Sequence, residues 1–172
     1  GRSTRAYGPA LALQVFAGNL PGVAVTALVR ALLVKAPSLG KLASGQPVLP
    51  VLFARAVSSV DPTVARALGV TYWPGGDREI RAQALQGADV VVVYGGGEAV
   101  AAYRAALPPG TRLVAHGPRF SAGLIARESC NAEAGGLVQD VARAVAAFDQ
   151  HGCVSPHAVW IEEGGPTAPV DM

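Results

Sequence analysis

Short runs of β-branched residues alternate along the chain with longer, alanine-rich segments whose apolar positions recur with the period of a helix. The clearest strand spans residues 88–94, which hold four consecutive valines and end at three glycines. Further strands are predicted at 11–17, 32–35, 70–73, 112–115, near residue 124 and at 159–161. Such alternation is typical of parallel strands joined by crossover helices. The sequence therefore predicts an α/β fold with a largely parallel sheet and helices on both faces.

Helix signals fall between these strands. Asp61 followed by Pro62 is an N-cap signature that opens a short helix to about residue 68. Asp77 caps a second helix, whose arginines Arg78 and Arg81 are expected to face water. Other helices are predicted at 23–31, 48–58, 98–107 and 132–148. The last of these places its apolar residues on one face: Val138, Val141, Ala142, Val145 and Phe148.

The composition fits one ordinary folded domain. The chain has 172 residues, of which 51% are hydrophobic and 15% charged, and this balance excludes a disordered protein. Fourteen basic residues nearly balance 12 acidic ones and never run longer than two in a row, so no nucleic-acid partner is predicted. Charged residues or glycines interrupt each apolar stretch before it reaches the length of a membrane span, so none is expected.

The chain ends and the two cysteines indicate where in the cell the protein is located and whether the chain is part of a longer protein. Residues 1–5 are polar and no signal peptide follows them, and two cysteines are too few for a disulfide framework. Both features predict a cytoplasmic protein. The chain starts without Met and ends in a loose tail, 164–172, so we expect an excised part of a longer protein.

Cys153 is the first candidate for chemistry. It lies in a glycine-softened loop, 148–156, where a substrate can reach the thiol and backbone N–H groups can bind a developing oxyanion. The alternative is a small buried hydrophobe, which is the interpretation we give to Cys130. A zinc site formed with His151 and His157 is a third possibility. Their spacing matches no common closed zinc pattern, so no metal is predicted.

Gly95, Gly96 and Gly97 follow a buried strand and precede a helix, a place where a phosphate or nicotinamide can approach the backbone closely. The full glycine fingerprint of dinucleotide-binding folds is absent, because position 100 is Val. A simple tight turn explains the three glycines equally well.

Lys35, at the end of a predicted strand, and Ser38 are the other binding candidates. They would offer a cation and a hydroxyl at the carboxyl edge of the sheet, where ligands bind in such folds. The alternative for Lys35 is an ordinary solvated lysine.

From about residue 10 to residue 165, these segments occur in an order that resembles the LuxC-type acyl-CoA reductases, the long-chain fatty-acid reductases of the aldehyde dehydrogenase superfamily. The most specific segment is 148–156, because it surrounds the cysteine that is acylated in this family. The other matching segments are 16–22, 33–37, 72–77, 93–96 and 115–117. The resemblance implies a Rossmann-like cofactor domain over residues 1–150. Residues 151–172 would be the nucleophile loop and the start of a truncated catalytic domain.

The resemblance also implies roles for single residues. Cys153 would take the acyl group as a thioester, and the amide of Asn19 would hold the oxyanion together with the Cys153 N–H. Lys35 would reach the adenine-ribose hydroxyls. Ser38 would stand where NAD-preferring relatives carry a glutamate, which favours NADPH. The glycine turn 95–97 would contact the nicotinamide half of the cofactor.

One departure from the superfamily pattern is informative. Dehydrogenases that hydrolyse their thioester keep a glutamate base at the position matched here by Ala115. Without a base to activate water, a thioester on Cys153 would survive until it meets hydride. A second departure is that the glutamine before Cys153 lies three residues away, where two are usual.

The function predicted from these features is NADPH-dependent reduction of a fatty acyl-CoA to the aldehyde through a thioester on Cys153. The resemblance also suggests a homo-oligomeric full-length enzyme that works with acyl-transferase and synthetase partners, while this chain alone is expected to have little activity. Two alternatives remain. One is another acylating aldehyde dehydrogenase or acyl reductase acting on short acyl groups, and the other is a non-enzymatic nucleotide-binding domain.

Overall fold

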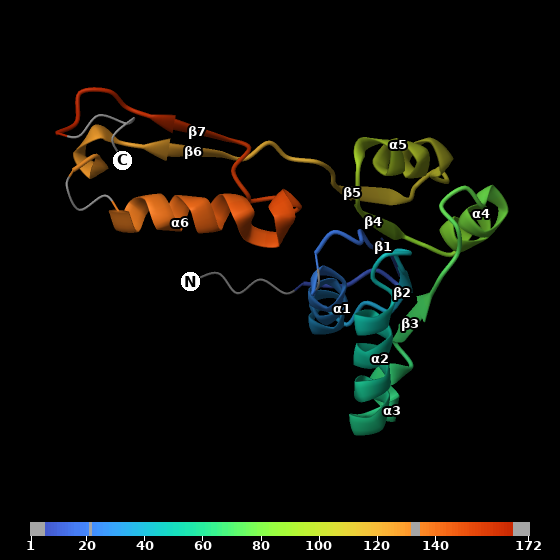
Figure 1. The fold of residues 1–172 in the computed structure, drawn as a ribbon. Coiled ribbons are helices and arrows are strands. Elements are labelled where there is room, and N and C mark those ends of the chain that lie inside the picture. Colours follow the sequence, from blue (N-terminus) through green and yellow to red (C-terminus); the bar gives the residue numbers. More distant parts are fainter. Residues whose placement is uncertain (1–5, 21, 132–134, 167–172) are drawn as a thin grey trace. The chain divides into compact units, whose positions relative to one another are not determined.

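A computed structural model describes residues 6–20, 22–131 and 135–166 of the protein (Figure 1). The chain forms two compact units, Gly1–Pro118 and Arg119–Met172. The boundary predicted after residue 150 therefore lies inside the second unit. Within the described ranges, no helix is both long and apolar enough to cross a membrane.

The first unit is built on a parallel sheet of five strands in the order β3-β2-β1-β4-β5. The strands are β1 (Ala12–Val15), β2 (Ser38–Lys41), β3 (Leu68–Thr71), β4 (Val90–Tyr94) and β5 (Arg112–His116). The chain builds outward from β1 to β3, then returns to the other side of β1 to add β4 and β5. In open sheets of this kind, ligands bind beyond the carboxyl ends of the strands where the order reverses, here between β1 and β4. The predicted α/β class is confirmed.

Helices cover both faces of this sheet: α1 (Val23–Leu33), α2 (Val48–Val60), α3 (Pro62–Ala65), α4 (Arg78–Gln86) and α5 (Gly97–Ala106). On one face, Leu13 and Val91 are fully buried against Leu85 of α4 and Tyr103 of α5. On the other face, α1 packs with Leu28 in a separate cluster that includes residues of α2. Two apolar clusters on opposite faces are what a doubly wound sheet requires.

The strand predicted at 32–35 is wrong. Helix α1 continues through Leu33, Lys35 turns the chain with a positive φ of 56°, and β2 begins only at Ser38. Residues 38–41 have low strand propensity, but β2 is hydrogen-bonded between β1 and β3. Inside the sheet, the amide of Gln14 donates to the Ser38 hydroxyl at 3.1 Å. Tertiary pairing therefore overrides local propensity here.

The two predicted helix caps are confirmed, whereas the predicted exposure of Arg81 is wrong. Asp61 accepts two backbone N–H bonds at the start of α3, and Asp77 accepts one at the start of α4. Helix α3 is shorter than predicted, and β3 begins two residues early, at Leu68. Arg81 does not face water as expected. It is half-buried, and its guanidinium carbon lies 5.7 Å from the centroid of the Tyr103 ring.

The second unit is a smaller βαβ arrangement. Strands β6 (Ala122–Ile125) and β7 (Ala158–Ile161) pair in parallel, and α6 (Gly135–Ala146) lies along them (Figure 1). The short helices η1 (Arg127–Ser129) and η2 (Ala147–Gln150) complete the connection. Helix α6 ends before Phe148, which has a φ of 55° and is 63% exposed, so its predicted place on the apolar face of this helix is wrong. Residues 132–134 of the predicted helix lie outside the described residues.

Candidate active site

The candidate residues fall in both units, and the carboxyl edge of the five-stranded sheet holds the first group. Asn19 lies in an exposed bend after β1. At Gly18, an added Cβ would lie 3.2 Å from the Cβ of Ala43, so the loop after β1 packs closely against the loop after β2. These two loops therefore pack together along the carboxyl edge of the sheet, called the rim below, at which the β1–β4 reversal point also lies.

The predicted glycine turn lies on this rim, directly after β4. The Gly95 N–H donates to the His116 carbonyl at 3.2 Å, which joins the turn to the end of β5. A Cβ added at Gly96 or Gly97 would meet nothing within 4 Å. Their backbone is therefore open to a bound group. Glu98 stands in the first turn of α5 and opposes an anion at that helix end, so the turn favours an uncharged ligand group.

An aromatic row borders the glycine turn. The Tyr94 ring stacks on the His116 ring with centroids 4.6 Å apart and planes 10° apart, and Phe16 lies on the other side of Tyr94 at 6.5 Å. Burial raises the pKa of Tyr94, an effect that the charge of Arg30 partly opposes, so the phenol stays protonated at neutral pH. This row was not predicted from the sequence. Tyr94 ends one predicted strand, His116 directly follows another and Phe16 lies near the end of a third, which was the available signal.

The cation at the carboxyl edge is Lys41. It is the last residue of β2 and pairs with Val15 of β1. Its ammonium nitrogen lies 5.7 Å from the centroid of the Tyr72 ring, which follows β3 directly. Partial burial lowers the pKa of Lys41. The turn after β2 continues through Ser44, and residues 41–47 contain no carboxylate.

Lys35 and Ser38 occupy the opposite edge. Lys35 lies in the turn between α1 and β2, and Ser38 pairs with Ala12 at the amino end of the sheet. Ser38 is only 3% exposed, and its hydroxyl is bonded to Gln14. Because ligands bind at the carboxyl edge of such sheets, the position expected for Lys35 and Ser38 was wrong. The error follows from the misplaced strand, because β2 ends at Lys41 and this residue, not Lys35, lies at the carboxyl edge.

The two cysteines of the second unit differ in access. Cys153 is exposed, in the loop between η2 and β7, whereas Cys130 is fully buried beside the Ala126 carbonyl. The buried interpretation of Cys130 is confirmed. The described part of the chain contains no group of three His, Cys, Asp or Glu side chains arranged to hold a metal ion, so His151, Cys153 and His157 do not form one.

The loop before Cys153 is backbone-strained. Phe148, Asp149 and Gln150 have positive φ values of 55°, 50° and 60°. For residues other than glycine, this conformation costs roughly 1–2 kcal/mol each. The turn is closed by Ser155, whose hydroxyl donates to the Ala147 carbonyl at 3.1 Å and whose N–H donates to the Gly152 carbonyl at 3.1 Å. Strain of this kind persists only where surrounding contacts hold it.

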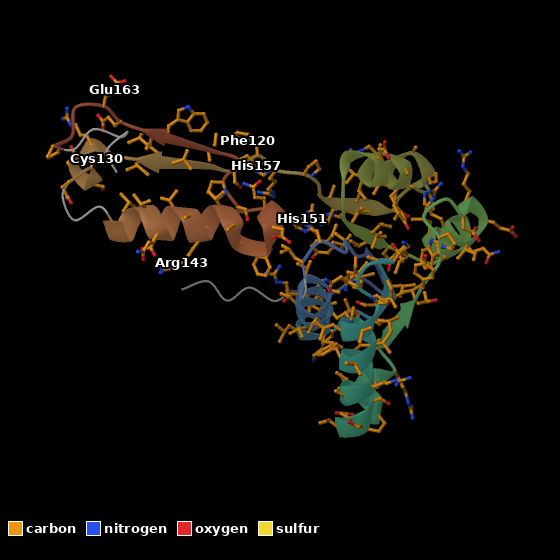
Figure 2. All side chains as sticks on the ribbon, in the orientation of Figure 1. Phe120, Cys130, Arg143, His151, His157 and Glu163 are labelled. Atoms are coloured by element: carbon orange, nitrogen blue, oxygen red, sulfur yellow. The ribbon has the colours of Figure 1, made fainter. Side chains whose placement is uncertain are left out.

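Ser121, which was not predicted from the sequence, contacts the same loop from the position directly before β6. Its hydroxyl donates to the Cys153 carbonyl at 2.6 Å, and its own carbonyl accepts from the His157 N–H at 2.8 Å. Beside it, the Phe120 and His157 rings stack with centroids 5.6 Å apart (Figure 2). The loop that carries the exposed Cys153 thiol is thus anchored by hydrogen bonds of Ser155 and Ser121.

The strand order of the first unit is that of a doubly wound α/β fold, a class in which dinucleotides bind at the reversal point of the sheet. The family described as "Acyl-CoA reductase (LuxC)" matches residues 1–172, and the chain belongs to this family. The recognition made from the sequence segments is therefore confirmed.

Individual relatives agree with this assignment. The chain is 29% identical over 154 residues to the long-chain acyl-protein thioester reductase of Aliivibrio fischeri and covers 31% of that protein. It is 30% identical over 160 residues to the protein of the same name from Photorhabdus luminescens and covers 32% of it. These matches span 87% and 91% of the chain, respectively. The chain therefore spans about a third of the length of these relatives.

A solved structure shows the same fold. The lactaldehyde dehydrogenase of Escherichia coli superposes with a TM-score of 0.76 at 15% sequence identity. The match covers 93% of this chain and 33% of that enzyme. The fold is thus that of aldehyde dehydrogenases.

Proposed function

We propose that this chain carries the cofactor edge and the nucleophile of an NADPH-dependent reductase, which converts a long-chain acyl thioester to the aldehyde through a thioester on Cys153. The observation that carries the proposal is the exposure of Cys153 on its strained, anchored loop, in a chain of this family, while Cys130 is buried. A reactive cysteine must be reachable, and a structural one need not be.

In the proposed first step, the Cys153 thiolate attacks the acyl carbonyl carbon, and the carbonyl electrons move onto its oxygen. As the tetrahedral intermediate collapses, the C–S bond of the donor breaks and the donor leaves as a thiolate. The Asn19 amide and the Cys153 N–H are the proposed donors to the oxyanion, roles taken from the family resemblance. Position 115 at the end of β5 carries Ala, so the position offers no base to activate water.

The residues of the first unit fit a nicotinamide cofactor. The open backbone at Gly96 and Gly97, next to the acidic Glu98, suits the uncharged nicotinamide ring better than a phosphate. When bound, the reduced cofactor supplies the hydride that turns the Cys153 thioester into the aldehyde. The protein's part is to hold this ring at the reversal point of the sheet and to keep the thioester from water.

The preference for NADPH is proposed from the end of β2. In dinucleotide-binding sheets, NAD is recognised there by a carboxylate that bonds the ribose 2′-hydroxyl. Residues 41–47 contain no carboxylate, and Lys41 supplies a positive charge at the end of β2. A 2′-phosphate therefore meets attraction and no acidic repulsion. Lys41, with Ser44 in the following turn, takes the role that the family resemblance implied for Lys35 and Ser38.

The acyl donor is proposed as a long-chain acyl thioester. The family description points to acyl-CoA, whereas the relatives' names point to an acyl group on a protein. The two donors present the same thioester carbonyl to Cys153. Fatty acyl-CoA is the donor that we expect, and the comparison with an acylated protein donor is part of the test.

The test is NADPH consumption by the protein as its gene encodes it, with acyl-CoA donors of increasing chain length and with an acyl-protein donor. We expect oxidation of NADPH and release of aldehyde with long chains, loss of both in Cys153→Ser, and retention in Cys130→Ser. A preference for short chains would assign a different acyl reductase. No turnover with any donor, together with intact NADPH binding, would leave a non-enzymatic nucleotide-binding protein.

A further inference from the structure

Ser121 and Cys153 are joined across 32 positions of the sequence. The Ser121 hydroxyl donates to the Cys153 carbonyl at 2.6 Å, while the Ser121 carbonyl accepts from the His157 N–H at 2.8 Å. Ser121 stands directly before β6, and His157 directly before β7. One residue at the start of a strand therefore contacts the loop at Cys153 itself and again where the loop enters β7.

The hydrogen bonds of Ser155 stabilise the turn from within, whereas those of Ser121 hold the loop from outside. Ser155 is 2% exposed and closes the turn on itself, through Ala147 and Gly152. A Cβ added at Gly152 would lie 2.8 Å from the Ser155 hydroxyl oxygen, so this inner turn is tightly packed. Ser121, in contrast, lies outside this loop, directly before β6, and its hydroxyl donates to the peptide carbonyl of the exposed Cys153. This hydrogen bond fixes the orientation of the Cys153 peptide relative to the sheet of β6 and β7.

We infer that Ser121 is a positioning residue for Cys153, whose hydroxyl holds the Cys153 peptide so that the thiol meets the acyl carbonyl at one angle. This inference rests on the proposed function. Nucleophilic attack needs the reacting atoms close together and aligned, and a small displacement of a positioned group lowers the rate strongly. Without the Ser121 hydroxyl, the Cys153 peptide can rotate and the thiol spreads over several orientations.

The test compares Ser121→Ala with Ser121→Thr, which keeps a hydroxyl. Ser59→Ala is the matched control, because the Ser59 hydroxyl also donates to a backbone carbonyl, that of Ala56 at 2.8 Å on α2. In single-turnover acylation by an acyl-CoA, Ser121→Ala should lower the maximal rate about tenfold and leave the half-saturating donor concentration within about twofold. Ser121→Thr should recover most of the rate, and Ser59→Ala should match the wild type.

A second readout does not depend on acyl chemistry. Hydrogen exchange at the amides of Ser155 and His157, both bonded in the loop, should be faster in Ser121→Ala and restored in Ser121→Thr. If the wild type forms no acyl-enzyme, the proposed function fails, and this exchange alone decides the positioning of the loop. Unchanged exchange in Ser121→Ala would overturn the inference.

Two further outcomes distinguish a role of Ser121 in positioning Cys153 from a role in folding stability alone. A lower melting temperature in Ser121→Ala, with an unchanged maximal acylation rate, would show a merely structural role and overturn the inference. Ser121→Cys, whose thiol is a weaker hydrogen-bond donor, should give an intermediate acylation rate. This variant replaces Ser121→Ala in the test if Ser121→Ala does not fold. A rate for Ser121→Cys equal to that of the wild type would also contradict the inference.

Discussion

The ammonium nitrogen of Lys41 lies 5.7 Å from the centroid of the Tyr72 ring, at the carboxyl ends of neighbouring strands. A cation this close to an aromatic face is attracted by the ring, so Tyr72 helps to hold the ammonium at the edge of the sheet. The turn that follows β2 lacks acidic residues. At this part of the edge we propose that an anionic group of the cofactor binds.

Cofactor preference should depend on Lys41. Replacing it in Lys41→Met removes the charge, and we expect NADPH affinity to fall about tenfold or more and NADH affinity to fall less. Ser44→Glu adds a carboxylate beside the edge and should also weaken NADPH more than NADH. Fluorescence titration of both cofactors measures this, with Ser59→Glu on α2 as a charge-matched control. Equal wild-type affinities for NADPH and NADH would contradict the assignment.

The pH dependence of NADPH binding should follow the same lysine. Burial lowers the pKa of Lys41 below its ordinary 10.5, so this residue loses its charge at a lower pH than an exposed lysine. NADPH affinity should therefore decrease with rising pH in a window below 10.5, and Lys41→Met should lack this step. Between the lowered pKa and 10.5, the unfolded state binds more protons, so Lys41 makes the free energy of unfolding rise with pH. An identical pH profile in Lys41→Met would contradict the role of Lys41.

Ser38 should now behave as a structural residue. Ser38→Ala removes the hydroxyl that accepts from the buried Gln14 amide, and we expect the free energy of unfolding to fall by about 1–3 kcal/mol. NADPH affinity should stay within twofold, because Ser38 lies at the amino end of the sheet. Urea unfolding and cofactor titration measure the two effects. A change in cofactor preference without a stability loss would restore Ser38 to the cofactor site.

Asn19 should affect acylation and not folding. If its amide binds the oxyanion, Asn19→Ala should slow acylation by about a hundredfold or more. Its position in an exposed bend predicts little change in the free energy of unfolding. Rapid-quench acylation and thermal unfolding test both statements. A rate change below about threefold would mean that Asn19 has no catalytic part.

Much of the fold could be predicted because its strongest signals are local. The four valines of β4 and the caps at Asp61 and Asp77 are each visible within a few residues of sequence. Strand β2 is different, since its residues are poor strand formers held between β1 and β3. Placing it six residues early moved Lys35 onto an edge that Lys41 in fact occupies.

Only those parts of the candidate site whose residues are adjacent in the sequence could be predicted. The glycine turn and the cysteine loop were found because each carries its signal in adjacent residues. The Ser121–Cys153 bond joins positions 32 residues apart, and the Tyr94–His116 stack joins two different strands. Contacts of this kind depend on strand pairing and loop closure, which periodicity does not encode. The positive φ values at 148–150 could not be foreseen, because none of these residues is glycine.

The central claim is that Cys153 carries the acyl group, and intact mass spectrometry tests it most directly. The protein, as its gene encodes it, is mixed with a long-chain acyl-CoA without NADPH, and peptide mapping locates the added acyl mass. We expect one acyl group on Cys153, which decays slowly in water and is discharged as aldehyde when NADPH is added. Cys130→Ser should label normally and Cys153→Ser should not. An acyl group on Cys130, no acyl group at all, or hydrolysis to the free acid as fast as reduction would contradict it.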